Sequence, residues 1–218
     1  MKYCNARDNR ATRRMLPIAC ATGLALALTI SLARPAHAER VTPPPVPAGL
    51  GADAGSRAFL VGHAVGTQNY VCLPSGSGFA WNLFTPEATL FSGSGKQLIT
   101  HFFSPNPDEN DTVRAAWQHS RDTSTVWAKL KTASSDADFV ELGAIPWLLL
   151  DVVGAEEGPQ GGDALGRTTQ IQRLNTFGGA APPTGCSAST DVGSKAFVPY
   201  TADYFFYSQP ESDEDDGN

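Results

Sequence analysis

Three of the four histidines lie after the N-terminal apolar segment, and they are the residues best suited to metal chemistry. His63, His101 and His119 could bind zinc or copper if the fold brought them together, with Asp111 or Asp122 nearby. Their spacing matches no ligand motif, so we expect no metal site. His101 lies on an apolar stretch, where a buried histidine bonded to a carbonyl is the structural alternative.

Aromatic residues and one arginine could face an organic ligand instead. The four tryptophans and the tyrosines near the C-terminus could line a sugar-binding face, although aromatic residues at every second position are more often core. Arg173, between Gln172 and Asn175, could anchor a ligand or form a structural ion pair. We take His101, Trp117 and Arg173 as the candidate ligand-facing residues.

Motifs of the common catalytic and nucleotide-binding sites are absent from the sequence. The segment Gly93-Ser94-Gly95-Lys96 resembles a phosphate-binding loop, but Leu90 stands at the first glycine position and Gln97 at the hydroxyl position. There is no GxGxxG fingerprint, no GxSxG nucleophile elbow and no HExxH motif. We therefore expect no cofactor, and we cannot assign a catalytic residue.

The elements that must position these residues are short β-strands. The longest apolar run after the N-terminal segment, 145–153, predicts a strand covered on both faces, with Pro146 at its entry. Alternation of apolar and polar residues predicts a half-buried strand at 124–131. Apolar residues keep helical spacing for no more than about two turns, so the fold class is all-β, a single-domain antiparallel β-sandwich or barrel with long loops. Further strands are predicted at 66–73, 79–84, 86–91, 97–103, 167–176 and 198–207, with a loop at 104–112.

The N-terminus has the pattern of a secretory signal peptide. Arg13-Arg14 precedes an apolar stretch at 16–32, which closes on Ala36-His37-Ala38, so residues 1–38 are predicted to be removed. Either general or twin-arginine export fits these residues. A retained membrane anchor is the alternative, but the stretch is short and Pro17 interrupts it. We expect a secreted or periplasmic protein that does not span a membrane after cleavage.

Two cysteines, Cys72 and Cys186, remain after the predicted cleavage. In an exported chain they predict one disulfide, which would close a loop of over a hundred residues. A metal-binding or nucleophilic thiol is the alternative, and it lacks local support such as a CxxC motif.

Composition divides the rest of the chain. Residues 39–56 form a Pro-rich linker, expected to be extended and without packed structure of its own. Residues 57–208 form the β domain, and 209–218 form an acidic tail expected to be disordered.

The predicted cleavage leaves a strongly acidic chain. Residues 1–38 contain six of the 16 basic and one of the 22 acidic residues, which leaves 10 basic and 21 acidic residues and a formal charge of −11. A domain this acidic is a poor nucleic-acid binder.

The segments that carry a family resemblance are Gly66-Thr67-Gln68-Asn69-Tyr70-Val71-Cys72, Trp81, Pro86-Glu87-Ala88, His101-Phe102, Ile145-Pro146-Trp147-Leu148-Leu149-Leu150, Ile171-Gln172-Arg173-Leu174-Asn175-Thr176, Gly178-Gly179, Cys186, Tyr200-Thr201-Ala202-Asp203-Tyr204 and Phe206-Tyr207. Together they resemble a known family of secreted proteins, DUF3455, over residues 66–207. The resemblance implies export, one compact domain and no established activity. Some fungal members carry a malate dehydrogenase label, which the missing nucleotide fingerprint does not support here. Family members place a Gly-Pro-x-Trp stretch soon after a His-Phe pair, and this chain departs from them by an expansion at 104–116.

The leading hypothesis is a non-enzymatic, exported envelope or extracellular β domain with a binding or structural role. Its partner would be a surface polymer, a small molecule or a protein. The alternative is a metal-dependent hydrolase or oxidoreductase that uses His101 with His63 or His119.

Overall fold

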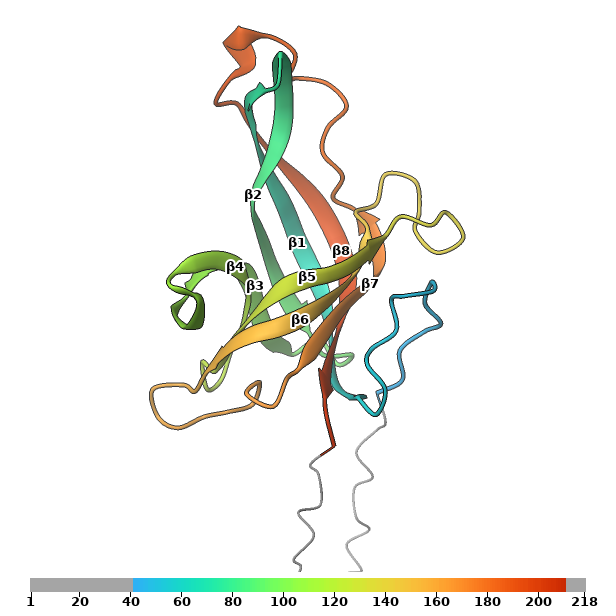
Figure 1. Ribbon diagram of the computed structural model, residues 1–218, viewed down its shortest axis with the longest axis vertical. Helices are drawn as coiled ribbons and strands as arrows, with labels where there is room; N and C mark the ends of the chain where they lie inside the picture. The colour runs from blue at the N-terminus through green and yellow to red at the C-terminus, as the bar shows by residue number, and fades with distance from the viewer. Residues whose placement is uncertain (1–40, 211–218) are drawn as a thin grey trace, which may run out of the picture. The chain divides into compact units, whose positions relative to one another are not determined.

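The computed structural model describes residues 41–210 of the 218-residue chain. The predicted signal peptide and residues 211–218 of the predicted tail lie outside the described residues. Eight antiparallel strands close into a barrel in chain order, since each strand pairs with the next and the last pairs with the first (Figure 1). The all-β prediction is confirmed, and the structure is a barrel rather than a sandwich. The elements are β1 (Arg57–Ser75), β2 (Gly78–Phe91), β3 (Gln97–Asn106), the 3-10 turn η1 (Pro107–Glu109), β4 (Thr112–His119), β5 (Thr125–Ser134), β6 (Trp147–Glu156), β7 (Gln170–Gly178), the 3-10 turn η2 (Ser189–Asp191) and β8 (Lys195–Ser208).

Some strands are longer than the sequence pattern predicts. The two strands predicted at 79–84 and 86–91 are a single strand, β2, and the split at Pro86 was wrong. Pro86 pairs with Gln68 of β1, whereas β2 pairs with β3 only from Ala88 onward. Because its other side is unpaired at that point, the strand tolerates a residue without an N–H group.

The predicted loop at 104–112 is mostly regular structure. β3 continues to Asn106, and η1 makes the turn into β4. The buried Asn106 side chain accepts from Asp108 N (3.1 Å) and donates to Val153 O (3.2 Å) on β6. The expansion noted in the sequence is therefore an anchored hairpin end.

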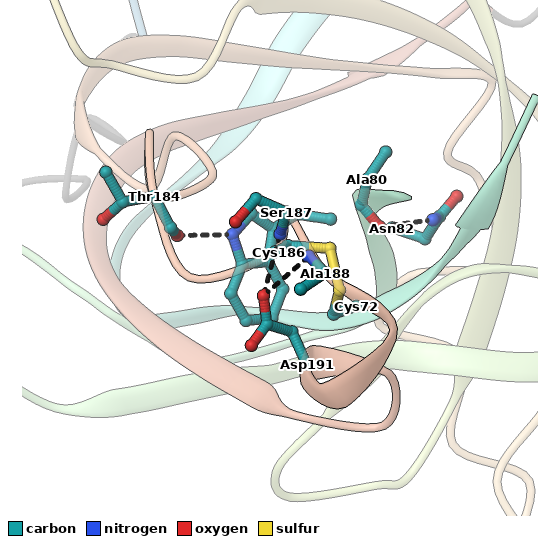
Figure 2. The surroundings of a disulfide bond; sticks show 9 residues. Cys72, Ala80, Asn82, Thr184, Cys186, Ser187, Ala188 and Asp191 are labelled. Carbon is teal, nitrogen blue, oxygen red and sulfur yellow. Dashed lines mark hydrogen bonds between the residues drawn. A yellow bond between two sulfur atoms is a disulfide. The ribbon is translucent and has the colours of Figure 1, made fainter. Parts of the chain in front are cut away.

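The far ends of β1 and β2 form an arm that β3 does not reach, seen at the top of Figure 1. The predicted disulfide, Cys72–Cys186, is present and ties the segment between β7 and β8 to this arm, with Cα atoms 5.5 Å apart (Figure 2). Cys72 N donates to Ser194 O, and Gly193 N donates to Cys72 O. The Asp191 carboxylate accepts from the N–H groups of Ser187 and Ala188, which orders the loop around Cys186.

The barrel has apolar residues on both faces of β6, as the run at 145–153 predicts. Leu150 belongs to the interior cluster, whereas Trp147 and Leu149 belong to a second cluster on the outside. Pro146 lies immediately before β6, as expected. The interior cluster contains Ala64, Ala88, Leu90, Ile99, Trp117, Val126, Ala128, Ile145, Leu150, Leu165, Ile171, Tyr200, Ala202, Tyr204 and Phe206.

The outer cluster is covered by residues 41–53, which we call the N-terminal strap (blue in Figure 1). Leu50 is only 1% exposed, and its carbonyl accepts a hydrogen bond from Gln172 of β7. Asp53 N donates to Gln170 Oε1 at 2.9 Å. The expectation that the Pro-rich segment has no packed structure was wrong here, because the apolar outer faces of β6, β7 and β8 need a cover.

Candidate functional site

His101 lies on the inner face of β3 and is buried. Its Nδ1 donates to the Ala116 carbonyl at 2.9 Å, as the structural alternative for this residue anticipated. Burial lowers the pKa of His101 to about 3, although the hydrogen bond to Ala116 acts in the opposite direction. The ring is therefore neutral at pH 7, with its hydrogen on Nδ1 and an unprotonated Nε2 that can accept a hydrogen bond.

Two aromatic rings enclose His101. Trp117, its register partner on β4, stacks against it with ring centroids 4.3 Å apart and planes 11° from parallel. Tyr204 of β8 packs against both rings, with its centroid 5.2 Å from that of His101 and 5.7 Å from that of Trp117. These three side chains come from β3, β4 and β8, so closure of the barrel is what assembles them.

Arg173 projects into the barrel from β7 and is 9% exposed. Its Nε and Nη2 donate to the carbonyl of Pro146 at 3.2 and 2.9 Å. No carboxylate pairs with it among the described residues, so the structural ion pair considered for Arg173 is not formed there. Its positive charge lies inside the barrel, where it acts to lower the pKa of both Tyr70 and His101.

A cavity of about 420 Å³ brings His101, Trp117 and Arg173 together. Apolar side chains make up most of its wall. Three of them are well exposed and form its mouth: Leu83 (41%), Val113 (59%) and Leu130 (57%). The other lining residues are Gln68, Tyr70, Pro86, Phe103, Arg114, Ala115, Ala128, Lys129, Ile145, Pro146, Leu148, Leu150 and Tyr204.

The polar groups of the described cavity wall are an amide, two phenols, an imidazole and three cationic side chains. Among its described lining residues there is no Asp, Glu, Ser, Thr or Cys that could act as a nucleophile or carboxylate base. Burial raises the pKa of Tyr70, whose hydroxyl donates to Gly179 O at 2.7 Å. His101, with a pKa of about 3, is a weak base.

The other two histidines lie elsewhere. His63 pairs with Asp203 (2.6 Å) between β1 and β8, and His119 pairs with Asp122 (2.8 Å) after β4. Partial burial would raise the pKa of Asp122, but hydrogen bonds from Ala164, Ser124 and His119 outweigh it and hold the pKa well below its usual range. Across residues 41–210, no three His, Cys, Asp or Glu side chains are grouped so that they could hold a metal ion. The metal-ligand set of the enzymatic alternative is not assembled.

Sequence reasoning missed Gln68 and Tyr70 as cavity residues, and it named Tyr204 only as one of the C-terminal tyrosines that could line a sugar-binding face. Gln68 and Tyr70 lie two positions apart on β1, and Tyr204 lies on the alternating strand β8. A period of two indicates which residues share a face, but not which face lines the cavity of a closed barrel. The alternation of residue types was visible in the sequence, but it did not show which face of each strand lines the cavity.

Comparison with known proteins identifies the family. In the described part of the chain no helix is long and apolar enough to cross a membrane. No curated protein and no solved structure matches the sequence. The sequence model of a family described as "Protein of unknown function (DUF3455)" matches residues 53–208, a range that includes all eight strands of the barrel. This match covers well over half of the sequence, so the chain belongs to the DUF3455 family.

Proposed function

We propose that this protein is an exported binding protein that holds a small molecule inside its barrel, between His101, Trp117 and Arg173. The observation that carries the proposal is the cavity of about 420 Å³, mostly apolar, with a few converging polar groups and an apolar mouth. Such a lining is typical of small-molecule sites. The signal-peptide pattern and the disulfide both favour export.

A small molecule fits better than the polymer or the protein among the partners considered from the sequence. A polymer chain needs an open groove, whereas the eight strands here close on themselves. The three candidate ligand-facing residues line the cavity behind its open mouth and are buried, so a flat protein surface could not reach them. Binding also fits the neutral His101 and the absence of a nucleophile from the described wall.

The direct test is titration with N-phenyl-1-naphthylamine, a neutral aromatic probe whose fluorescence rises in apolar surroundings. We expect one molecule to bind per chain, with quenching of tryptophan emission that is reduced in Trp117→Phe. Ala128→Leu, which places three extra carbons into the cavity wall, should weaken binding at least about tenfold. Ala133→Leu on the same strand is the control, since Ala133 is exposed and does not line the cavity.

Ala115→Leu on β4 is a second filling variant in case Ala128→Leu does not fold. Absence of saturable binding to the wild-type protein would overturn the proposal. Equal binding by Ala128→Leu, Ala115→Leu and Ala133→Leu would place the probe outside the cavity and would also overturn it.

A further inference from the structure

We infer that the ligand is an organic acid, an apolar body that ends in a carboxylate, and that Arg173 binds the carboxylate. This inference rests on the proposed function and names the chemical class of its ligand. Two features of the cavity carry it: a buried cation without a counter-ion, and the position of that cation away from the exposed apolar residues of the mouth.

The buried cation is Arg173. A guanidinium in an apolar interior is costly unless an anion accompanies it, and buried arginines are rarely left unpaired. The Pro146 carbonyl accepts two of its hydrogen bonds but supplies no negative charge. No Asp or Glu among the described residues forms an ion pair with Arg173, and none of the described lining residues is acidic. A ligand carboxylate would supply the missing charge, in the geometry that a guanidinium prefers.

The distribution of charge fixes the orientation. The mouth residues Leu83, Val113 and Leu130 are 41–59% exposed, whereas Arg173 is 9% exposed. Two other cations line the wall. Arg114 is paired with Glu109 by two hydrogen bonds of 2.8 and 2.9 Å, and Lys129 is exposed to solvent, so Arg173 is the buried cation of the described wall. The carboxylate therefore enters first and meets Arg173, and the apolar body fills the space toward the mouth.

The test compares 2-naphthoate with 2-naphthamide, which have the same ring system and differ in the charge of the head group. Each displaces N-phenyl-1-naphthylamine from the wild-type protein at pH 7.5, and the two inhibition constants are compared. We expect the carboxylate to bind at least about tenfold more tightly, because hydrogen bonds to charged groups are worth more than neutral ones. Arg173→Gln should reduce this preference to less than about threefold, while naphthamide affinity changes little. Arg173→Lys should keep part of the preference, because charge remains but the planar fork is lost.

Arg121→Gln, at an exposed arginine outside the cavity, is the matched control and should keep the full preference. Equal binding of the two naphthalenes by the wild-type protein would overturn the inference, and this comparison needs no variant. If Arg173→Gln weakens binding of both compounds equally, Arg173 has a structural role only. If the preference for 2-naphthoate is lost in Arg114→Gln alone, the carboxylate binds to Arg114 and not to Arg173. Failure of the neutral probe itself to bind would instead overturn the proposed function.

Discussion

His101 and Trp117 stack across the β3–β4 ladder with ring planes 11° from parallel, and the Ala116 carbonyl next to Trp117 accepts the hydrogen of His101 Nδ1. The neighbouring strand thus fixes both the orientation and the tautomer of the imidazole. Protonation of Nε2 would place a charge in a buried site, where Arg173 also acts against it. Burial and Arg173 therefore keep the imidazole an uncharged acceptor, and the stack and the hydrogen bond hold it in place.

This arrangement predicts that His101 makes the protein less stable in mild acid. The pKa of His101 is about 3 in the folded protein, against about 6.5 in an unfolded chain. Between these values the unfolded state binds one more proton, so the free energy of unfolding falls as pH drops below about 6.5, by up to about 1.4 kcal/mol per pH unit. Urea unfolding at pH 7, 6 and 5 should show this extra slope in the wild type and not in His101→Phe. Parallel pH profiles for the two proteins would mean that His101 is not held neutral.

The disulfide should stabilise the fold without contributing to binding. Cys72 and Cys186 are 114 residues apart, and the chain-entropy model gives about 4–5 kcal/mol for closing such a loop. Neither cysteine lines the cavity. We expect the double variant Cys72→Ala, Cys186→Ala to lose up to this free energy of unfolding in urea, with probe affinity within about twofold of the wild type. A large loss of affinity in the folded double variant would show that the arm shapes the cavity.

The features that sequence predicted correctly depend on local pattern. The apolar run at 145–153 indicated a strand covered on both faces, and β6 indeed has Leu150 inside and Trp147 outside, both buried. The cysteine count indicated the disulfide, and the apolar neighbours of His101 indicated a buried ring bonded to a carbonyl. Each conclusion required only residue types and their spacing.

The features that sequence missed depend on contacts between distant segments. Pro86 looked like a strand break because nothing in the sequence shows that β3 leaves that part of β2 unpaired. To predict the cavity, one must know which faces of β1 and β8 point inward. The sequence offered His101, Trp117 and Arg173 as separate candidates and did not show that they share one cavity. Their shared cavity is a consequence of barrel closure.

The N-terminal strap should contribute substantially to stability through Leu50. This side chain is 1% exposed and packs among residues of the outer cluster, so Leu50→Ala leaves a cavity there. We expect a loss of about 2–4 kcal/mol in the free energy of unfolding. Leu142→Ala is the matched control, because Leu142 is fully exposed and should change stability by less than about 0.5 kcal/mol. If both variants unfold at the same urea concentration, the strap does not cover the barrel in solution.

Gly66 permits a close approach between β1 and β2. A Cβ atom at this position would lie 2.0 Å from Glu87 O and 2.6 Å from Ala88 Cα, which are backbone atoms that cannot rotate away. Gly66→Ala must therefore displace the β1–β2 ladder, at a cost of about 1–3 kcal/mol. Gly93→Ala is the control, since its new methyl group would meet no atom within 4 Å.

The same displacement should reach the cavity. Gln68 follows Gly66 by two residues on β1, and its register partner Pro86 also lines the cavity. A shift of the ladder therefore moves two parts of the wall, and folded Gly66→Ala should bind N-phenyl-1-naphthylamine more weakly than the wild type, whereas Gly93→Ala should not. Urea unfolding and probe titration of both variants separate the two effects. If Gly66→Ala is as stable as the wild type, β1 and β2 lie farther apart in solution than the 2.0 Å separation between this Cβ and the Glu87 carbonyl oxygen implies.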